Sequence, residues 1–200
     1  MKTLKIVLAI TALSLSSITF ANPGTITING KIYNETCVLT GGTNALGTTN
    51  VVVTLDTIPS SNFTTTTRMS GLKNFDVTLS KTDGTACYTA TGLSANLAPV
   101  VTLSTSTSAD YSATETTALV NKAGTKSTTN PVFVQILAKP TSVGAGTLVD
   151  YSNTSTQAKA AYDSTANKFY YSAQYYAGTG SILPAAQDVN AVVTYNITYP

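Results

Sequence analysis

The sequence contains no histidine and no tryptophan among its 200 residues, and only 10% of the residues are charged. Histidine is the commonest general base and the commonest metal ligand, so its absence removes the usual means of acid–base and metal chemistry. The nine acidic residues are scattered along the chain, several of them in turn-like settings that favour aspartate for backbone reasons. We therefore expect no enzyme, no metal and no cofactor, although two distant carboxylates could still meet in space as in a glycosidase.

Charge of either sign is scarce and balanced. The chain has 11 Lys and Arg against 9 Asp and Glu, and without Lys2 and Lys5 the remainder has nine of each. No basic run is present, so neither a nucleic acid nor an anionic membrane is expected as a partner. A polar surface with a net charge near zero instead favours association between protein molecules.

The first hydrophobic run is too short to span a membrane. Lys2 and Lys5 precede a mostly apolar run from Ile6 to Leu15, and Thr19-Phe20-Ala21 is a small-x-small cleavage pattern. A membrane-spanning helix needs roughly 20 apolar residues. Residues 1–21 are therefore predicted to be a signal peptide, with no membrane insertion after its removal. The remaining chain is long enough for one domain with its own core.

There are only two cysteines, Cys37 and Cys87. Behind a secretion signal they predict one disulfide, and it should contribute about 4 kcal/mol by closing a loop of roughly 50 residues. A zinc site is the rival interpretation, but two thiols without any histidine cannot complete a zinc shell.

No segment has the pattern of a helix. Short runs rich in β-branched and aromatic residues alternate with Gly, Asn, Ser, Asp and Pro, which predicts a β-sandwich. The expected strands are 50–55, 74–79, 99–103, 130–138, 168–177 and 191–199, with 104–129 and 140–167 as loops or short exposed strands. In the second of these strands, Phe75, Val77 and Leu79 should face inward.

Amphipathic strands are predicted at both ends of the mature chain. Ile26, Ile28, Gly30 and Ile32 alternate at the front, where Gly30 stands in place of a third large residue; Val193, Tyr195, Ile197 and Tyr199 alternate at the back. From periodicity alone, the simplest interpretation is that both strands pack on the chain's own core.

Several motifs occur in a familiar order behind the signal peptide. They are GTITINGKIYNETC (24–37), Val53-Thr54-Leu55 with Ile58 and Phe63, FDVTL (75–79) before Cys87, VQIL (134–137), AQYYA (173–177) and TYNITYP (194–200), with a penultimate Tyr199. In this order they resemble the pilins of the chaperone–usher pathway, in particular the type 1 fimbrial major-subunit family. The chain departs from that pattern in a longer turn before Cys87 and in Gln187, which stands where the family tends to have a glycine.

The resemblance implies an all-β fold, an incomplete immunoglobulin-like sandwich that lacks its last strand and carries an N-terminal donor-strand extension. Residues 22–33 would be the donor arm and residues 34–200 the pilin domain. Val193, Tyr195, Ile197 and Tyr199 would border the open groove and be recognised by the chaperone. Gly30 would lie against a groove pocket too shallow for a side chain.

The partners implied are copies of the same chain and other pilins, a periplasmic pilus chaperone and an outer-membrane usher. The implied destination is a fimbrium at the cell surface, reached through the periplasm, with a role in adhesion. Two other functions stay open. One is a minor adapter or tip subunit, or a carbohydrate-binding module that stacks sugars on the tyrosines of 168–177. The other is a secreted β-sandwich enzyme.

Overall fold

The computed structural model describes residues 37–87, 98–179 and 183–199, so the predicted signal peptide and donor arm lie outside the described residues. The strands within these ranges are β1 (Val38–Gly41), β2 (Met69–Ser80), β3 (Val100–Ser104), β4 (Ala118–Leu119), β5 (Phe133–Lys139), β6 (Thr147–Leu148), β7 (Tyr162–Asp163), β8 (Lys168–Tyr176) and β9 (Thr194–Thr198). Two short 3-10 turns, Ser60–Asn62 and Ser108–Asp110, are the helical segments of the described chain. Neither is long or apolar enough to cross a membrane.

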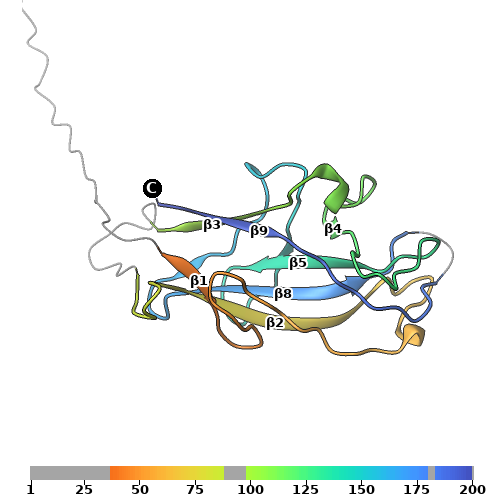
Figure 1. Ribbon diagram of the computed structural model, residues 1–200, viewed down its shortest axis with the longest axis horizontal. Helices are drawn as coiled ribbons and strands as arrows, with labels where there is room; N and C mark the ends of the chain where they lie inside the picture. Colours follow the sequence, from red (N-terminus) through yellow and green to blue (C-terminus); the bar gives the residue numbers. More distant parts are fainter. Residues whose placement is uncertain (1–36, 88–97, 180–182, 200) are drawn as a thin grey trace, which may run out of the picture. The chain divides into compact units, whose positions relative to one another are not determined.

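The strands form two antiparallel sheets (Figure 1). The larger sheet has the order β1-β2-β8-β5-β4, with β6 paired to β5 and β7 to β8. The smaller sheet consists of β3 and β9, paired from Val100↔Thr198 to Ser104↔Thr194. The fold is therefore all-β, as predicted.

The core face of the large sheet is formed mainly by β2 and β8. Their register places Phe75 opposite Tyr171 and Val77 opposite Phe169. Val77, Phe169 and Tyr171 are buried, and the rings of Phe75 and Tyr171 stack with their centroids 5.6 Å apart. The predicted inward face of 74–79 is thus confirmed.

The opposite face of β2 is not the exposed surface that the sequence pattern suggests. Asp76 is buried, and its Oδ1 lies 2.9 Å from Lys168 Nζ. The hydrogen bond to Asp76 raises the pKa of Lys168. Lys139 of β5, which is also buried, donates to Asn74 Oδ1 at 3.0 Å on this face. Alternation predicts two faces of a strand, but it does not say what covers the outer one.

The expected strand at 50–55 is wrong as a regular strand. Only Val52 makes a bridge, to Leu46, through reciprocal backbone bonds of 2.8 and 2.9 Å. Beyond Val52 the segment still alternates, with Val53 and Leu55 half-buried and Thr54 exposed. The side-chain pattern of a strand is present, but no described strand pairs with it, and a strand requires a partner.

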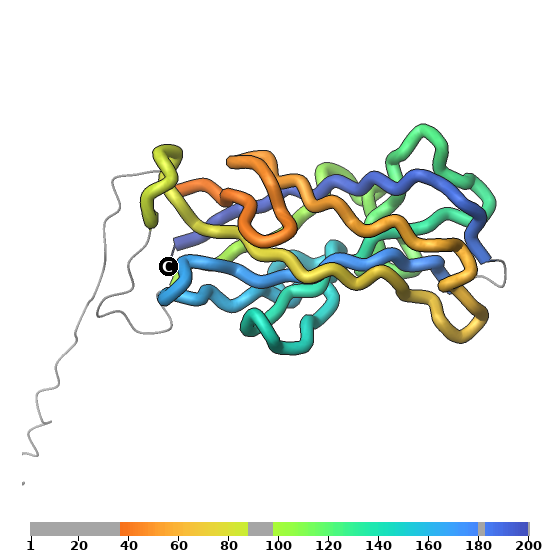
Figure 2. The backbone as a smooth tube through the Cα atoms, turned by 90° about the horizontal axis from the view of Figure 1, so that it is seen from below, coloured from red at the N-terminus to blue at the C-terminus, as the bar shows by residue number. Residues whose placement is uncertain are grey.

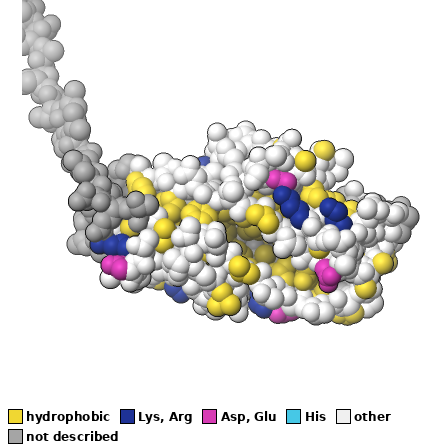
Figure 3. Space-filling view, viewed as in Figure 1, with side chains coloured by type: hydrophobic (Ala, Val, Ile, Leu, Met, Phe, Trp, Pro, Cys, Tyr) yellow, Lys and Arg dark blue, Asp and Glu magenta, His cyan; other side chains and the backbone are white. Residues whose placement is uncertain are grey.

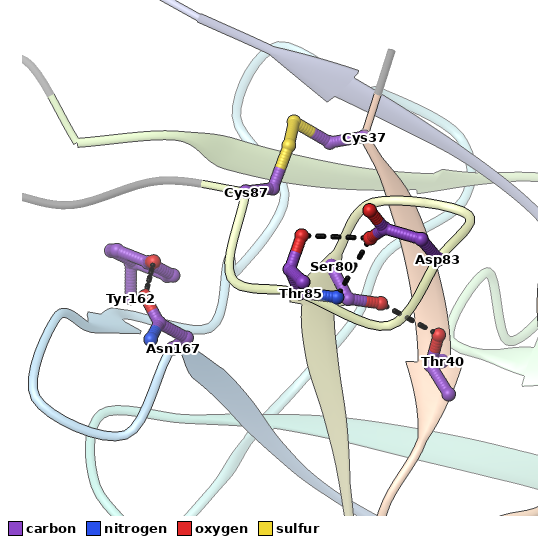
Figure 4. The surroundings of a disulfide bond; sticks show 8 residues. All are labelled: Cys37, Thr40, Ser80, Asp83, Thr85, Cys87, Tyr162 and Asn167. Carbon is purple, nitrogen blue, oxygen red and sulfur yellow. Dashed lines mark hydrogen bonds between the residues drawn. A yellow bond between two sulfur atoms is a disulfide. The ribbon is translucent and has the colours of Figure 1, made fainter. Parts of the chain in front are cut away.

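The disulfide joins Cys37, immediately before β1, to Cys87, with 5.8 Å between the Cα atoms (Figure 4). The longer turn before Cys87 is built by Lys81 N donating to the Thr85 carbonyl at 2.9 Å. The Asp83 carboxylate accepts from both the backbone N and the hydroxyl of Thr85, and these bonds lower the pKa of Asp83. The extra residues of this turn are therefore accommodated by local hydrogen bonds.

Candidate functional site

The C-terminal segment presents one apolar row that is only partly covered. Val193, Tyr195, Ile197 and Tyr199 are half-buried, and Val192, Thr194, Asn196 and Thr198 between them are exposed. The two-residue period shows that one side of this segment faces the interior. That side is less completely buried than the equivalent face of β8, where Phe169 is 0% exposed.

The two outer edges of the small sheet differ in their hydrogen-bond partners. On β3, the side-chain amide of Gln157 accepts from Leu103 N at 2.9 Å and donates to the Leu103 carbonyl at 2.8 Å. Gln157 is itself buried, so at Leu103 this edge of the sheet is covered by a side chain. On β9, no described strand pairs with the edge away from β3. The row of half-buried side chains therefore runs beside an open strand edge.

A second unpaired segment runs along the same side of the described body. In Figures 1 and 2, residues 51–58 (orange) and the segment that ends in β9 (blue) both run lengthwise along the described body. Figure 3 shows hydrophobic side chains gathered along a hollow in this face. We call this feature the apolar hollow. The half-buried residues of the two segments are Val51, Val53 and Leu55 on one and Val193, Tyr195, Ile197 and Tyr199 on the other. The backbone groups of residues 53–57 make no backbone hydrogen bond to other described residues.

Tyr195 reaches from the small sheet to the large one. Its hydroxyl oxygen lies 3.5 Å from the backbone N of Leu39 in β1, which donates to it. The Leu39 carbonyl accepts from Thr49 N at 3.0 Å, so neither polar group of Leu39 is directed to β2. Tyr195 thus provides a partner for an N–H on the outer edge of β1, where a strand neighbour would otherwise be needed.

The interior of the described body contains buried phenols. Burial raises the pKa of Tyr171 and of Tyr151, well above the usual range of a tyrosine. Neither hydroxyl has a hydrogen-bond partner among the described residues. Within those residues, no group of three or more acidic or cysteine side chains is placed to hold a metal ion.

The sequence did not predict a hydrogen-bonded cluster of polar side chains before β9. Gln187 Oε1 accepts from Ser127 N and Val132 N, each at 3.2 Å, and its Nε2 donates to the Asn130 carbonyl at 3.0 Å. Asn121, which is fully buried, donates to the Asp188 carbonyl at 2.7 Å. The departure at Gln187 was visible in the sequence, but nothing in the sequence pointed to its partners, which lie more than 50 residues away. These hydrogen bonds hold the segment that precedes the half-buried row of Val193, Tyr195, Ile197 and Tyr199.

Two of the tyrosines in the strand 168–177 are not available as a stacking surface. Tyr171 and Tyr176 are buried in β8, and the ring of Tyr176 packs near Phe133 with 6.2 Å between centroids. Stacking on a sugar requires an exposed ring face, so these two residues cannot supply the carbohydrate site that the sequence left open.

The predicted site residues therefore fall into three groups. The structure places Cys37 and Cys87 in one disulfide. It places Val193, Tyr195, Ile197 and Tyr199 in one half-buried row on the segment that contains β9. Ile26, Ile28, Gly30 and Ile32 lie outside the described residues. Chemically, the arrangement offers an open strand edge and apolar contacts, which is what an added β-strand requires.

The described architecture is an antiparallel two-sheet fold of the immunoglobulin-like kind found in pilins. Among solved structures, the chain is similar to the P pilus rod subunit PapA, with 13% identity and a TM-score of 0.50 over 89% of this chain and 100% of that one. It is also similar to a subunit from a chaperone–usher pilus structure described as revealing the basis of rod uncoiling, with 16% identity, a TM-score of 0.46, and 91% and 99% of the two chains covered. No family model matches the sequence, and the search of curated proteins found no relative. The fold is similar to that of the P pilus rod subunit PapA.

Proposed function

We propose that this chain is a structural subunit of a surface pilus that polymerises by strand donation. Residues 22–33 of one copy would lie along β9 of the next copy and fill the apolar hollow there. The observation that carries this proposal is the contrast between the two edges of the small sheet. Gln157 closes the edge at β3, whereas the edge of β9 stays open beside four half-buried apolar side chains.

The sequence of the arm suits this role. Ile26, Ile28 and Ile32 would each contribute roughly 1.5–3 kcal/mol on burial. Each backbone hydrogen bond to the open edge would add about 1 kcal/mol. The larger consequence is kinetic, because dissociation requires a whole strand to leave a packed core.

An arm that serves a second copy makes every subunit a donor at one end and an acceptor at the other. Such a contact is heterologous and does not close, so it builds an open filament. Until the arm arrives, the edge of β9 is a hazard for aggregation. A periplasmic chaperone that covers the edge, and an outer-membrane usher that exchanges the chaperone for the next arm, meet this need. The subunit then reaches the cell surface, where the filament supports adhesion.

Deletion of residues 22–32 tests the proposal. The truncated chain keeps its whole body, so we expect it to accumulate in the periplasm but to form no filaments. The measurement is negative-stain microscopy of material sheared from the cell surface, with the chain identified in it. An internal control replaces Thr25, Thr27 and Asn29, whose positions alternate with the isoleucines, by serine; this variant should still assemble. Filaments of normal yield from the truncated chain would disprove the donor assignment.

A further inference from the structure

The extended C-terminal segment is longer than the strand that it contains. β9 has only five residues. The alternation of half-buried and exposed side chains begins earlier, at Gln187, and continues without a break to Tyr199. From Val189 to Val193, the backbone groups of the half-buried residues make no hydrogen bond to other described residues. The open edge of β9 is therefore prolonged by residues that no described strand holds in place.

Asn121 supplies a partner on one side of this segment. Its side chain is fully buried; its Nδ2 donates to the Asp188 carbonyl at 2.7 Å, and its Oδ1 accepts from Asn190 N at 3.0 Å. Lys122 N donates to the Asn190 carbonyl at 2.7 Å. In an extended chain, residues two apart direct their backbone groups to the same side. These bonds therefore occupy the side of Asp188 and Asn190 and leave the side of Val189 free.

Gln187 fixes the beginning of the same segment. Its Oε1 accepts from Asn121 Nδ2 at 3.3 Å, as well as from Ser127 N and Val132 N. The two amides together join the segment to the loop before β5. At its other end, the segment continues into the pairs that β9 makes with β3. Without the amides, an unpaired backbone between these points would regain its conformational entropy and leave the extended state.

The arm predicted ahead of the first cysteine needs an edge of this length. Residues 22–33 number twelve, more than twice the five residues of β9, whereas residues 187–199 number thirteen. A strand added along β9 alone would leave many of its backbone groups without partners. An edge that is already extended also lowers the ordering cost of binding, which raises affinity.

From these observations we infer that Asn121 and Gln187 are positioning residues of the acceptor. They hold residues 187–193 in line with β9, so that the whole edge is formed before the arm of a second copy arrives. The inference rests on the proposed function, since it names the residues that prepare the edge for that arm. Both residues act through the backbone of the segment and not through contact with the arm.

Two full-length chains, expressed together with different tags, separate this role from general stability. One carries Ile28→Arg in the arm and can only accept an arm; the other carries Ile197→Arg in the hollow and can only donate one. The measurement is the detergent-resistant heterodimer, seen by gel electrophoresis without heating and divided by the accumulated amount of the accepting chain. Gln187→Ala in the accepting chain should lower this ratio about fivefold or more, the factor that corresponds to one hydrogen bond.

The same substitution in the donating chain should leave the ratio unchanged, because the edge of that chain is not used. Gln157→Ala is the matched control: it removes an amide that covers the edge of β3, away from the open edge. It should lower the accumulation of either chain and leave the ratio unchanged. Asn121→Ala should act like Gln187→Ala; if it does not accumulate because Asn121 is buried, Gln187→Ala alone decides the outcome.

The outcomes distinguish this inference from the proposed function. An equal loss of heterodimer from Gln187→Ala in the accepting and the donating chain would overturn the positioning role, since a general loss of stability acts on both. An unchanged ratio with Gln187→Ala in the accepting chain would also overturn it. If the two parent chains form no heterodimer at all, the proposed function itself fails.

Discussion

At the scale of single residues, several acidic side chains of the described residues accept hydrogen bonds from the backbone. Asp110 lies in the turn before β4; its Oδ2 accepts from Thr107 N at 3.0 Å and its Oδ1 lies 2.7 Å from Lys122 Nζ. The hydrogen bond from Lys122 lowers the pKa of Asp110 from its ordinary value of 3.8. The charged form of Asp110 therefore stabilises the folded chain.

This shift gives a pH dependence with a definite sign. Because the pKa of Asp110 is lower in the folded chain than in the unfolded one, its contribution is fully present above pH 3.8 and is lost as the pH falls below that value. Asp110→Asn should lower the melting temperature at pH 7. The difference from the unchanged chain should shrink as the pH is lowered below 3.8. Thermal melting followed by circular dichroism at a series of pH values measures both effects.

A control for this prediction is Asp56→Asn. Asp56 also pairs with a lysine, Lys73, but its side chain is 72% exposed. Exposed ion pairs contribute little, so the melting temperature at pH 7 should hardly change. A gap between Asp110→Asn and the unchanged chain that stays constant down to pH 2 would contradict the assignment.

At the scale of secondary-structure elements, the closed edge of β3 is as informative as the open edge of β9. Gln157 bonds both backbone groups of Leu103 and also donates to the Asp150 carbonyl at 3.3 Å. A buried backbone N–H and C=O left without partners cost roughly 1–3 kcal/mol each. Gln157 therefore gives Leu103 of β3 the two hydrogen bonds that a neighbouring strand would give.

Gln157→Ala should lower the free energy of unfolding by roughly 2–4 kcal/mol, since both Leu103 groups lose their partner. It should also increase aggregation, because a second strand edge becomes available. Asn62→Ala is the matched control, since the Asn62 amide is exposed and makes a long bond of 3.4 Å to Ser70 Oγ. Denaturant unfolding and light scattering give the two readings. Equal stability of the two variants would show that Gln157 does not close the edge.

The elements differ in how well the sequence predicts them. The alternation of 74–79 and of 191–199 predicts β2 and β9 because each has one apolar face along its length. The run 50–55 has the same alternation without becoming a strand, because a side-chain pattern cannot supply a missing partner. Gln157 and Gln187 could not be predicted at all, since their backbone partners are loop and strand positions remote in sequence.

At the scale of the whole molecule, the described residues form a well-buried core, but one edge of the small sheet has no partner strand. Leu79, Val101, Leu119 and Phe169 are almost completely buried, as in any stable domain. Along β9, half-buried residues accompany an open strand edge. The sequence alone indicated this arrangement through its resemblance to pilins and through the isoleucine row ahead of Cys37, and not through periodicity, which equally allows an arm that packs on its own body.

The central claim is that the arm completes a different copy of the chain, and two defective variants can test it directly. One variant lacks residues 22–32 and can only accept an arm. The other carries Ile197→Arg, which places a charge in the hollow, so it can only donate one. Each alone should give no polymer. Expressed together with different tags, they should give a detergent-resistant one-to-one heterodimer that does not extend further, as seen by gel electrophoresis without heating and by native mass spectrometry. Absence of the heterodimer, with the arm-bearing variant remaining a stable monomer, would contradict the account.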